Sequence, residues 1–535
     1  MKTPFFVAAL VLWAQFVHSQ AAQVSLPDLF GDHAIMQRAK DTAVWGKAEP
    51  GETVTVTLAD VSATAKAGND GWWLARLDTS KLADGPFDLT AKGASGEVKS
   101  QDILVGEVWL AGGQSNMELT LAESMDGKEA VAQSGNENIR FYMVPKCAVT
   151  GEELEEAEAA AAWQICGPGT SAVMSAAAYY FAVQIEASRG VPVGIICCAW
   201  GGTSVSCWMS EKSLMKTAAG RKYIEDYDRL VGDKTDQQYE AEMEEYRREW
   251  EAWNSRVEER RRQEPSVTWE VLNEECGLCP WPQPAGRRSP FRPAGIYRSM
   301  TERVCPFGIR GFLYYQGEED EAKYADYDWM MISLIMEWRE AWGDLTLPFL
   351  FVQLPMYTSK DDWVHGIDSR HWAMMRDQQK KVSETIAHTG LAILTDCGEF
   401  DNIHPLDKKT VGTRLALLAR NKVYGEDLIA DAPAFEQAEL GEGKVRVRFS
   451  HTGGSLRAKS AELRGFELAG EDGAFYPAKA SIQKDWVNLS SEQVQEPVYV
   501  RYAWHNYCQA DLYGESGLPA APFRTDHFSI EDREG

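Results

Sequence analysis

The chain has 535 residues, of which 44% are hydrophobic and 11% aromatic. This length and composition predict about two to four domains with ample core. Its 80 aspartate and glutamate residues outweigh 54 lysine and arginine residues, giving a formal net charge of −26. That balance argues against nucleic acid or an anionic membrane surface as a partner.

The N-terminal segment predicts export. Met1 and Lys2 precede a short apolar run from Phe5 to Trp13, and small residues up to Ala22 offer a cleavage site. This order is typical of a secretory signal peptide, here residues 1–22, and it predicts a periplasmic or extracellular protein. A buried N-terminal helix fits less well because the run is short. No later stretch approaches the ~20 apolar residues of a membrane span, so none is expected.

Two regions have the alternating pattern of β-strands. Residues 23–105 contain runs such as 53–58, separated by turn-forming Gly, Asp and Asn. The same pattern returns in residues 426–535, for example at 445–449. Period-two runs with regular turns predict a small β-sandwich at each end of the chain.

Residues 106–425 alternate strand-like and helix-like patterns, which predicts an α/β domain around a parallel sheet. Within this domain, the segment from about residue 222 to about residue 290 is expected to form a helical insertion. Tyr239, Met243, Tyr246, Trp250 and Trp253 recur there at steps of three and four residues. Such spacing places them on one face of a long helix that packs on the catalytic domain or on another subunit.

The first candidate for chemistry is Ser115. It follows the apolar run from Val108 to Ala111 and the glycines Gly112 and Gly113. Open α/β sheets bind ligands at the carboxyl ends of their strands, where glycines permit a tight turn. Ser115 is therefore a candidate nucleophile, although a serine in a turn or at a helix N-cap gives the same pattern.

A second constellation, from Asp401 to Pro405, supplies the other groups that a serine nucleophile needs. His404 could accept the Ser115 proton, and Asp401 could orient the imidazole. Asp396 also precedes His404 and is an alternative third member, although it follows the apolar run 392–394 and fits a strand end better. On its own, a histidine before proline can also be an ordinary loop residue.

A third candidate group follows the buried run 191–198. Gly201 and Gly202 stand at its end, where a backbone N–H could approach Ser115 and help to form an oxyanion hole. An ordinary turn between a strand and a loop would have the same sequence.

The candidate residues lie in four short blocks, which are Gly113-Gln114-Ser115-Asn116-Met117, Gly201-Gly202-Thr203, Tyr315-Gln316-Gly317-Glu318 and Asp401-x-x-His404-Pro405. In this order they resemble conserved blocks of the sialate O-acetylesterase branch of the SGNH (GDSL-like) hydrolases. The resemblance extends into both terminal regions and covers nearly the whole mature chain. It implies a flavodoxin-like hydrolase domain flanked by the two β modules.

The resemblance also implies roles for individual residues. Ser115, His404 and Asp401 would be catalytic, and the oxyanion would meet the backbone N–H groups of Ser115 and Gly202 and the side-chain amide of Gln316. Further substrate contacts are expected from Asn116, Glu318 and Arg376. Family members commonly have Ser-Asn after Gly-Glu, whereas this chain has Glu319-Asp320, so a different substrate preference is expected. No metal or cofactor is expected.

The implied activity is carbohydrate O-acetyl ester hydrolysis through an acetyl-enzyme, most directly on O-acetylated sialic acids. No residue of the four blocks identifies sialic acid as the substrate, and a net charge of −26 does not favour binding of an anionic sugar. An acetyl-xylan-type polysaccharide esterase using the same site therefore remains an alternative. A catalytically inactive carbohydrate-binding protein is the alternative from another class. The sequence leaves the oligomeric state open.

The ten cysteines could pair in an oxidising compartment, but their spacing does not give the pairing. Cys276 and Cys279 form one CxxC motif without a second pair or nearby histidines. A local disulfide or free thiols are expected there rather than zinc.

Overall fold

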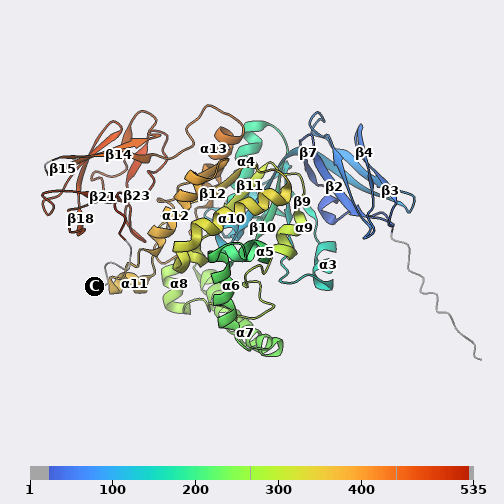
Figure 1. Ribbon diagram of the computed structural model, residues 1–535, viewed down its shortest axis with the longest axis horizontal. Coiled ribbons are helices and arrows are strands. Elements are labelled where there is room, and N and C mark those ends of the chain that lie inside the picture. The colour runs from blue at the N-terminus through green and yellow to red at the C-terminus, as the bar shows by residue number, and fades with distance from the viewer. Residues whose placement is uncertain (1–22, 265–266, 442, 529–535) are drawn as a thin grey trace, which may run out of the picture.

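One long strand, β7 (Glu97–Gly113), belongs to two parts of the molecule at once. The computed structural model describes residues 23–264, 267–441 and 443–528, so the predicted signal peptide lies outside the described residues. The first part of β7 pairs with strands of the N-terminal module, and its last part runs through the centre of the catalytic sheet. Figure 1 shows the α/β domain between the two β modules.

The N-terminal module consists of short strands, most of which pair in antiparallel fashion. Its strands are β1 (Ile35–Gln37), β2 (Thr42–Lys47), β3 (Thr53–Leu58), β4 (Val61–Lys66), β5 (Trp72–Leu77) and β6 (Phe87–Lys92). β3 pairs with β4 and β6, β6 pairs with β7, and β2 pairs with β5. Exposed and buried residues alternate along β3 and β5, as the sequence pattern predicted.

The central sheet has the strand order β13-β12-β11-β7-β10-β8-β9. Besides β7, its strands are β8 (Asn136–Met143), β9 (Trp163–Cys166), β10 (Val193–Ala199), β11 (Gly311–Tyr315), β12 (Phe349–Val352) and β13 (Thr389–Ala392). All pairs are parallel except β8 with β9. Five neighbouring strands of this sheet lie in the order β10-β7-β11-β12-β13. When these five are numbered as they occur along the chain, the order is 2-1-3-4-5, which is that of flavodoxin-like sheets. The predicted fold class is confirmed.

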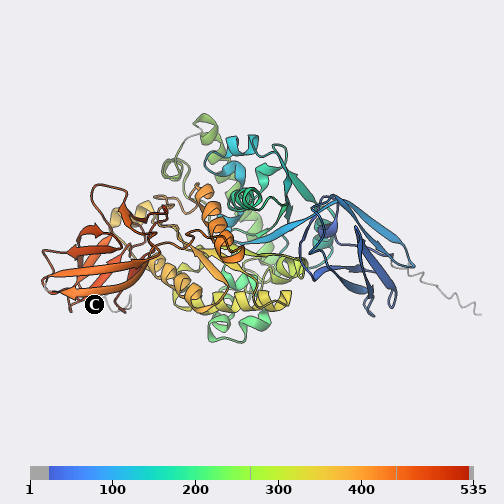
Figure 2. The ribbon, with the colours of Figure 1, turned by 90° about the horizontal axis from the view of Figure 1, so that it is seen from above.

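Helices cover this sheet on both faces (Figure 2). Trp109 of β7 contacts Phe181 of α4, whereas Phe312 of β11 points to the opposite face and contacts Trp338 of α10. Neighbouring residues of a strand point to opposite faces, so the continuous apolar runs fill two cores. The helices of this domain, apart from the insertion, are α1 (Ser115–Glu118), α2 (Gly127–Ala132), α3 (Glu152–Ala159), α4 (Ala176–Arg189), α5 (Glu211–Leu214), α9 (Glu302–Val304), α10 (Tyr324–Trp342), α11 (Lys360–His365), α12 (His371–Thr385) and α13 (Lys408–Leu418).

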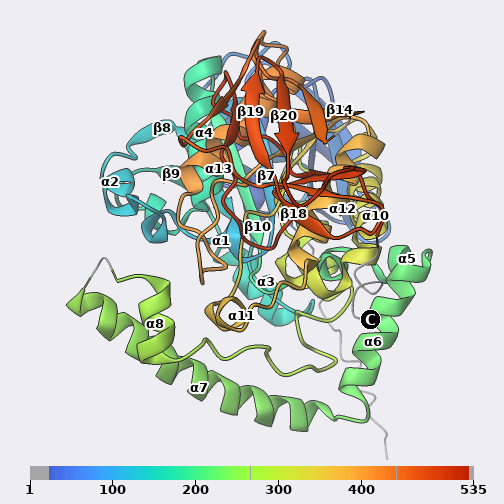
Figure 3. The same ribbon diagram turned by 90° about the vertical axis from the view of Figure 1, so that its left-hand side faces the viewer.

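The insertion forms three helices, α6 (Ala218–Val231), α7 (Asp236–Gln263) and α8 (Trp269–Cys276). α7 starts in a capping box, in which Thr235 accepts a hydrogen bond from the Gln238 N–H and the Gln238 side chain accepts one from the Thr235 N–H. Tyr239 and Trp253 are buried on the predicted stripe. Figure 3 shows α7 and α8 along one side of the molecule.

The C-terminal module contains two four-stranded antiparallel sheets, β14-β15-β20-β19 and β18-β17-β21-β23, and a pair formed by β16 and β22. Phe449, Phe466, Tyr502 and Phe523 pack together in its core. Its strands are β14 (Ala434–Gly441), β15 (Lys444–Ser450), β16 (Leu456–Ala458), β17 (Phe466–Ala469), β18 (Phe475–Pro477), β19 (Lys479–Gln483), β20 (Trp486–Ser490), β21 (Tyr499–Tyr502), β22 (Leu512–Gly514) and β23 (Phe523–Arg524).

All ten cysteines lie in the described residues as free thiols. Cys276 and Cys279 of the CxxC motif are therefore free thiols, the first buried and the second exposed. Among the described helices, none is both long and apolar enough to cross a membrane.

Candidate active site

Three strands of the central sheet end at the same level. Gly113 at the end of β7 lies opposite Ala199 of β10 and Tyr315 of β11. The residues that follow these strands, including Ser115, Gly202 and Gln316, are therefore held at one edge of the sheet. This is the switch point at which flavodoxin-like sheets bind ligands.

Ser115 is the first residue of α1, directly after the turn that ends β7. Gly113 has a φ of 132°, and a Cβ atom built there would lie 2.1 Å from the Tyr315 carbonyl oxygen. Only glycine fits this turn, because other residues avoid such a φ and would collide with β11.

The Ser115 Oγ atom lies 2.8 Å from Nε2 of His404, so the nucleophile and base candidates share a hydrogen bond. The loop after β13 positions the imidazole. The side-chain oxygen of Asn402 accepts a hydrogen bond from the backbone N–H of His404 at 3.0 Å, and the Asn402 amide donates to Glu399 at 2.7 Å. The Glu399 carboxylate also accepts the Leu406 N–H at 2.7 Å. This geometry is that of a serine activated by an adjacent general base.

Burial of the imidazole and the nearby ammonium group of Lys408 lower the pKa of His404 to about 4. Both effects disfavour the imidazolium form. His404 is therefore neutral in near-neutral solution, the state in which it can accept a proton.

This pKa predicts an unusually acidic limb in the pH profile of kcat/KM. Because the pKa is lowered, His404 is protonated and inactive only below about pH 4, and activity should rise through that pH to a plateau. Removing the charge with Lys408→Met should raise the His404 pKa and move the limb to higher pH. A limb near pH 6.5 in the parent protein would contradict the assignment.

Asn116 and Glu318 occupy a buried network beneath the serine, not the position of substrate contacts that was predicted. The Asn116 amide donates to Glu318 at 2.6 Å, and its oxygen accepts from Lys408 at 2.6 Å. Burial raises the pKa of Glu318 to about 7 and lowers that of Lys408 to about 8. All three side chains are nearly inaccessible to solvent, so they fix the floor of the site.

Asp401 does not form the predicted hydrogen bond with the His404 imidazole. Its carboxylate accepts the Lys360 backbone N–H at 2.8 Å and the Asn273 amide at 3.1 Å. Asp401 has a φ of 55°, and no described carboxylate makes a hydrogen bond or ion pair with the His404 imidazole. The alternative, Asp396, is paired with Arg414 at 2.6 Å. The structure thus contains a Ser–His pair, with Asp401 joining its loop to α8.

Gly202 lies at the predicted edge, with a φ of 73°. The neighbouring Gly201 is close to the nucleophile, since a Cβ built there would lie 3.2 Å from Cβ of Ser115. The Gly201 N–H donates to Glu118 at 2.5 Å, whereas no described group accepts a hydrogen bond from the N–H of Gly202 or Ser115. Those two donors remain available for an oxyanion.

Gln316 is at the predicted strand end, but its amide is engaged within the protein. It donates to Gln114 at 3.1 Å, to the Thr203 carbonyl at 3.2 Å and to Asp320 at 2.5 Å. Its oxygen accepts from Tyr327 at 2.9 Å. With its two N–H bonds shared among three acceptors, Gln316 joins the ends of the strands and has no donor directed at an oxyanion.

We therefore expect Gln316→Ala to act mainly on stability. The change removes one hydrogen-bond donor from each of the buried side chains of Asp320 and Gln114, which keep their other donors. It should lower the free energy of unfolding by about 1–3 kcal/mol. Denaturant unfolding measures this. A loss of about 10²–10³ in kcat with unchanged unfolding would instead assign Gln316 to the oxyanion hole.

Arg376 lies outside the site. Its buried guanidinium donates to the carbonyl oxygens of Pro355 and of His505 in the C-terminal module. Burial lowers its pKa to about 10. It joins α12 to that module and does not contact the site, contrary to the prediction.

Two charged residues of the site were not found from the sequence. Lys408 lies four residues after His404 and Glu118 three residues after Ser115, and these short separations were the available signal. Glu118 holds Gly201 and also pairs with Lys146. In the described ranges no cluster of histidine, cysteine, aspartate or glutamate could hold a metal ion.

Comparisons with known proteins point to carbohydrate esterases. A family model described as carbohydrate esterase, sialic acid-specific acetylesterase, matches residues 105–225 and 287–418. The sialate O-acetylesterase of Mus musculus is 26% identical, covering 97% of each chain. The sialate O-acetylesterase of Homo sapiens is 25% identical over 97% of this chain and 95% of its own.

A solved structure, described as a novel carbohydrate acetylesterase from Xanthomonas citri, has a TM-score of 0.73 and 32% sequence identity. The alignment covers 94% of this chain and 100% of that one. The family model spans the strand ends that carry Ser115, Gly202, Gln316 and His404. This chain therefore belongs to the sialic acid-specific acetylesterase family of carbohydrate esterases.

Proposed function

We propose that this protein removes O-acetyl groups from sialic acids, with Ser115 as the nucleophile and His404 as the general base. The observation that carries the proposal is the 2.8 Å hydrogen bond between Ser115 Oγ and His404 Nε2 at the switch point of the sheet. The family supplies the substrate class, acetylated carbohydrates.

The reaction needs two similar displacements at the acetyl carbon. His404 takes the hydroxyl proton as Ser115 Oγ attacks the carbonyl carbon, and the resulting oxyanion accepts hydrogen bonds from the N–H groups of Ser115 and Gly202. His404 then protonates the sugar oxygen as its bond to the acetyl carbon breaks. Water, deprotonated by His404, then attacks the acetyl-enzyme, and His404 returns the proton to Ser115 Oγ as its bond to the acetyl carbon breaks and acetate leaves.

Release of acetate tests the substrate directly. Incubation with 9-O-acetyl-N-acetylneuraminic acid should release acetate faster than incubation with acetylated xylan. Faster release from xylan would favour a polysaccharide esterase. Failure to hydrolyse even p-nitrophenyl acetate would favour a carbohydrate-binding protein without activity.

The role of Asp401 gives a separate prediction. We expect Asp401→Asn to lower kcat less than about tenfold, because the carboxylate is bound to Lys360 and Asn273 and does not set the His404 tautomer. A loss of several hundredfold would mean that the carboxylate turns to Nδ1 of His404 during catalysis. Asp396→Asn, which breaks the pair with Arg414, is the matched comparison.

We also propose that the protein is exported with removal of residues 1–22, on the basis of the N-terminal pattern. N-terminal sequencing of the protein recovered outside the cytoplasm is the test. An intact Met1 would contradict the proposal.

A further inference from the structure

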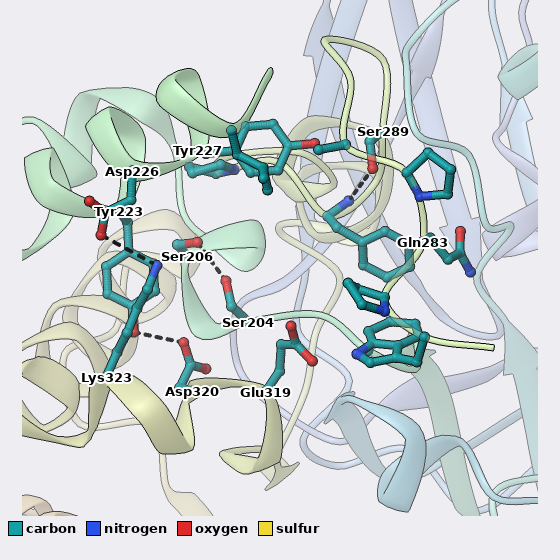
Figure 4. A pocket seen from close by; sticks show the side chains of 18 of the residues that line it. Ser204, Ser206, Tyr223, Asp226, Tyr227, Gln283, Ser289, Glu319, Asp320 and Lys323 are labelled. Carbon is teal, nitrogen blue, oxygen red and sulfur yellow. Dashed lines mark hydrogen bonds and ion pairs between the residues drawn. The ribbon is translucent and has the colours of Figure 1, made fainter. Parts of the chain in front are cut away.

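A pocket of about 450 Å³ adjoins the catalytic site on the side of the insertion. It shares Gly202 with the predicted oxyanion hole and extends from there between η6 (Glu318–Lys323) and α6. Figure 4 shows Ser204 and Glu319 on the side of the catalytic domain and Tyr227, Gln283 and Ser289 on the facing wall. A group bound in this pocket would lie next to the atoms that react.

The facing wall comes largely from a segment that the family model does not match. The family model matches residues 105–225 and 287–418, so it leaves out residues 226–286. Much of the pocket lining comes from this unmatched segment, namely Asp226, Tyr227, Leu230, Lys234, Trp281 and Gln283. The segment adds a wall to a site whose reacting groups lie in the matched parts.

The lining combines an exposed aromatic ring with polar groups. Trp281 is 47% exposed, and its indole lies against Gly202, where an added Cβ would be 2.0 Å from the ring. Trp281 is kept in place by an edge-to-face contact with Phe291, with 5.5 Å between ring centroids. An exposed ring surrounded by hydroxyl, amide and carboxylate groups suits a pyranose, which has an apolar C–H face and a polar rim.

The charges of the pocket favour a neutral sugar. Lys234 is paired with Glu242 at 2.6 Å and Lys323 with Asp226 at 3.8 Å, so each described basic side chain that lines the pocket has an acidic partner. The exposed Glu319 adds a carboxyl group, whose pKa is raised by the surrounding walls and by Asp320. A carboxylated sugar would find no unpaired cation here, whereas hydroxyl groups would find acceptors.

We propose that this pocket is a subsite for a neutral pyranose attached to the acetylated sugar, with Trp281 as its stacking platform. The preferred substrate is then an acetylated glycoside or oligosaccharide, not a free acetylated monosaccharide. The inference rests on Ser115 being the nucleophile, because the position of that residue makes the pocket adjacent to the reaction.

The test compares paired substrates on the full chain. The parent should have a kcat/KM at least about tenfold higher for 9-O-acetylated sialyllactose than for free 9-O-acetyl-N-acetylneuraminic acid. Trp281→Ala should remove this preference, because it should lower kcat/KM about tenfold more for the oligosaccharide than for the free sugar. Trp329→Ala, which truncates a 61% exposed tryptophan outside the pocket, is the control and should change neither substrate.

Turnover of p-nitrophenyl acetate separates failure of the subsite from failure of the catalytic site. Trp281→Ala should lower this turnover about tenfold less than it lowers turnover of the oligosaccharide. An equal loss on all three substrates would mean that Trp281 only supports Gly202, which overturns the subsite. An equal kcat/KM for both sialic acid substrates in the parent would also overturn it. If neither is cleaved but p-nitrophenyl acetate is, the sialic acid assignment fails, and acetylated xylobiose against acetylated xylose then tests the subsite with the same expectations.

Discussion

Ser115→Ala should lower kcat for acetyl ester hydrolysis by at least ~10³-fold while leaving the fold intact. The substitution removes the oxygen that lies 2.8 Å from His404 and would form the acetyl-enzyme. Ser115 is the first residue of a four-residue helix, and its side chain forms no N-cap hydrogen bond, so little stability depends on the hydroxyl. Acetate release and thermal unfolding measure the two effects.

Ser333→Ala is a matched control, because Ser333 is a partly exposed serine on α10 that donates only to the Trp329 carbonyl oxygen. It should leave activity unchanged. Trapping strengthens the test: a phosphonate ester should add one covalent group to the parent and none to Ser115→Ala, as mass spectrometry would report. Activity of Ser115→Ala within tenfold of the parent would overturn the assignment of the nucleophile.

The positions that follow the strands were predictable from the sequence. Continuous apolar runs identified β7, β10 and β11, and parallel strands place their carboxyl ends at one edge. The register of Gly113 with Ala199 and Tyr315 follows the same logic, and it brings Ser115 close to Gly202. Local pattern was sufficient here because the backbone itself carries these residues to the site.

The directions of long polar side chains were not predictable in the same way. Asp401 is bound to Asn273, 128 residues away in the insertion, and Arg376 to His505, 129 residues away in the C-terminal module. Gln316 likewise donates to Gln114, from which it is separated by 202 positions. A motif fixes the place of such a residue along the chain, but its partner depends on tertiary packing.

Burial explains why the electrostatics of the site were also missed. From the sequence alone, Lys408 looks like an exposed residue in the first, polar turn of a helix. In the structure it is inaccessible to solvent and donates hydrogen bonds to Asn116 and to the Pro405 carbonyl oxygen. Its charge contributes to the low pKa of His404. A histidine whose pKa is lowered in this way is a weaker base, but it is neutral over a wider pH range.

His404→Gln should lower kcat by at least ~10³-fold, because glutamine can hold a hydrogen bond to Ser115 but cannot accept its proton at these pH values. Substrate binding, measured as the Kd of acetylated sialyllactose for the variant, should change little. His365→Gln, at an exposed histidine of α11, is the matched control and should behave as the parent.

A variant that kept most of its activity would need another base. Lys408 is the nearest candidate, since burial lowers its pKa to about 8 and its ammonium group is already bonded to the Asn116 that follows Ser115. A lysine base would require deprotonation, so activity of His404→Gln would then rise with pH through about 8. The parent, acting through His404, should already be at its plateau well below that pH. The pH profile of the variant therefore separates the two bases even if some turnover survives.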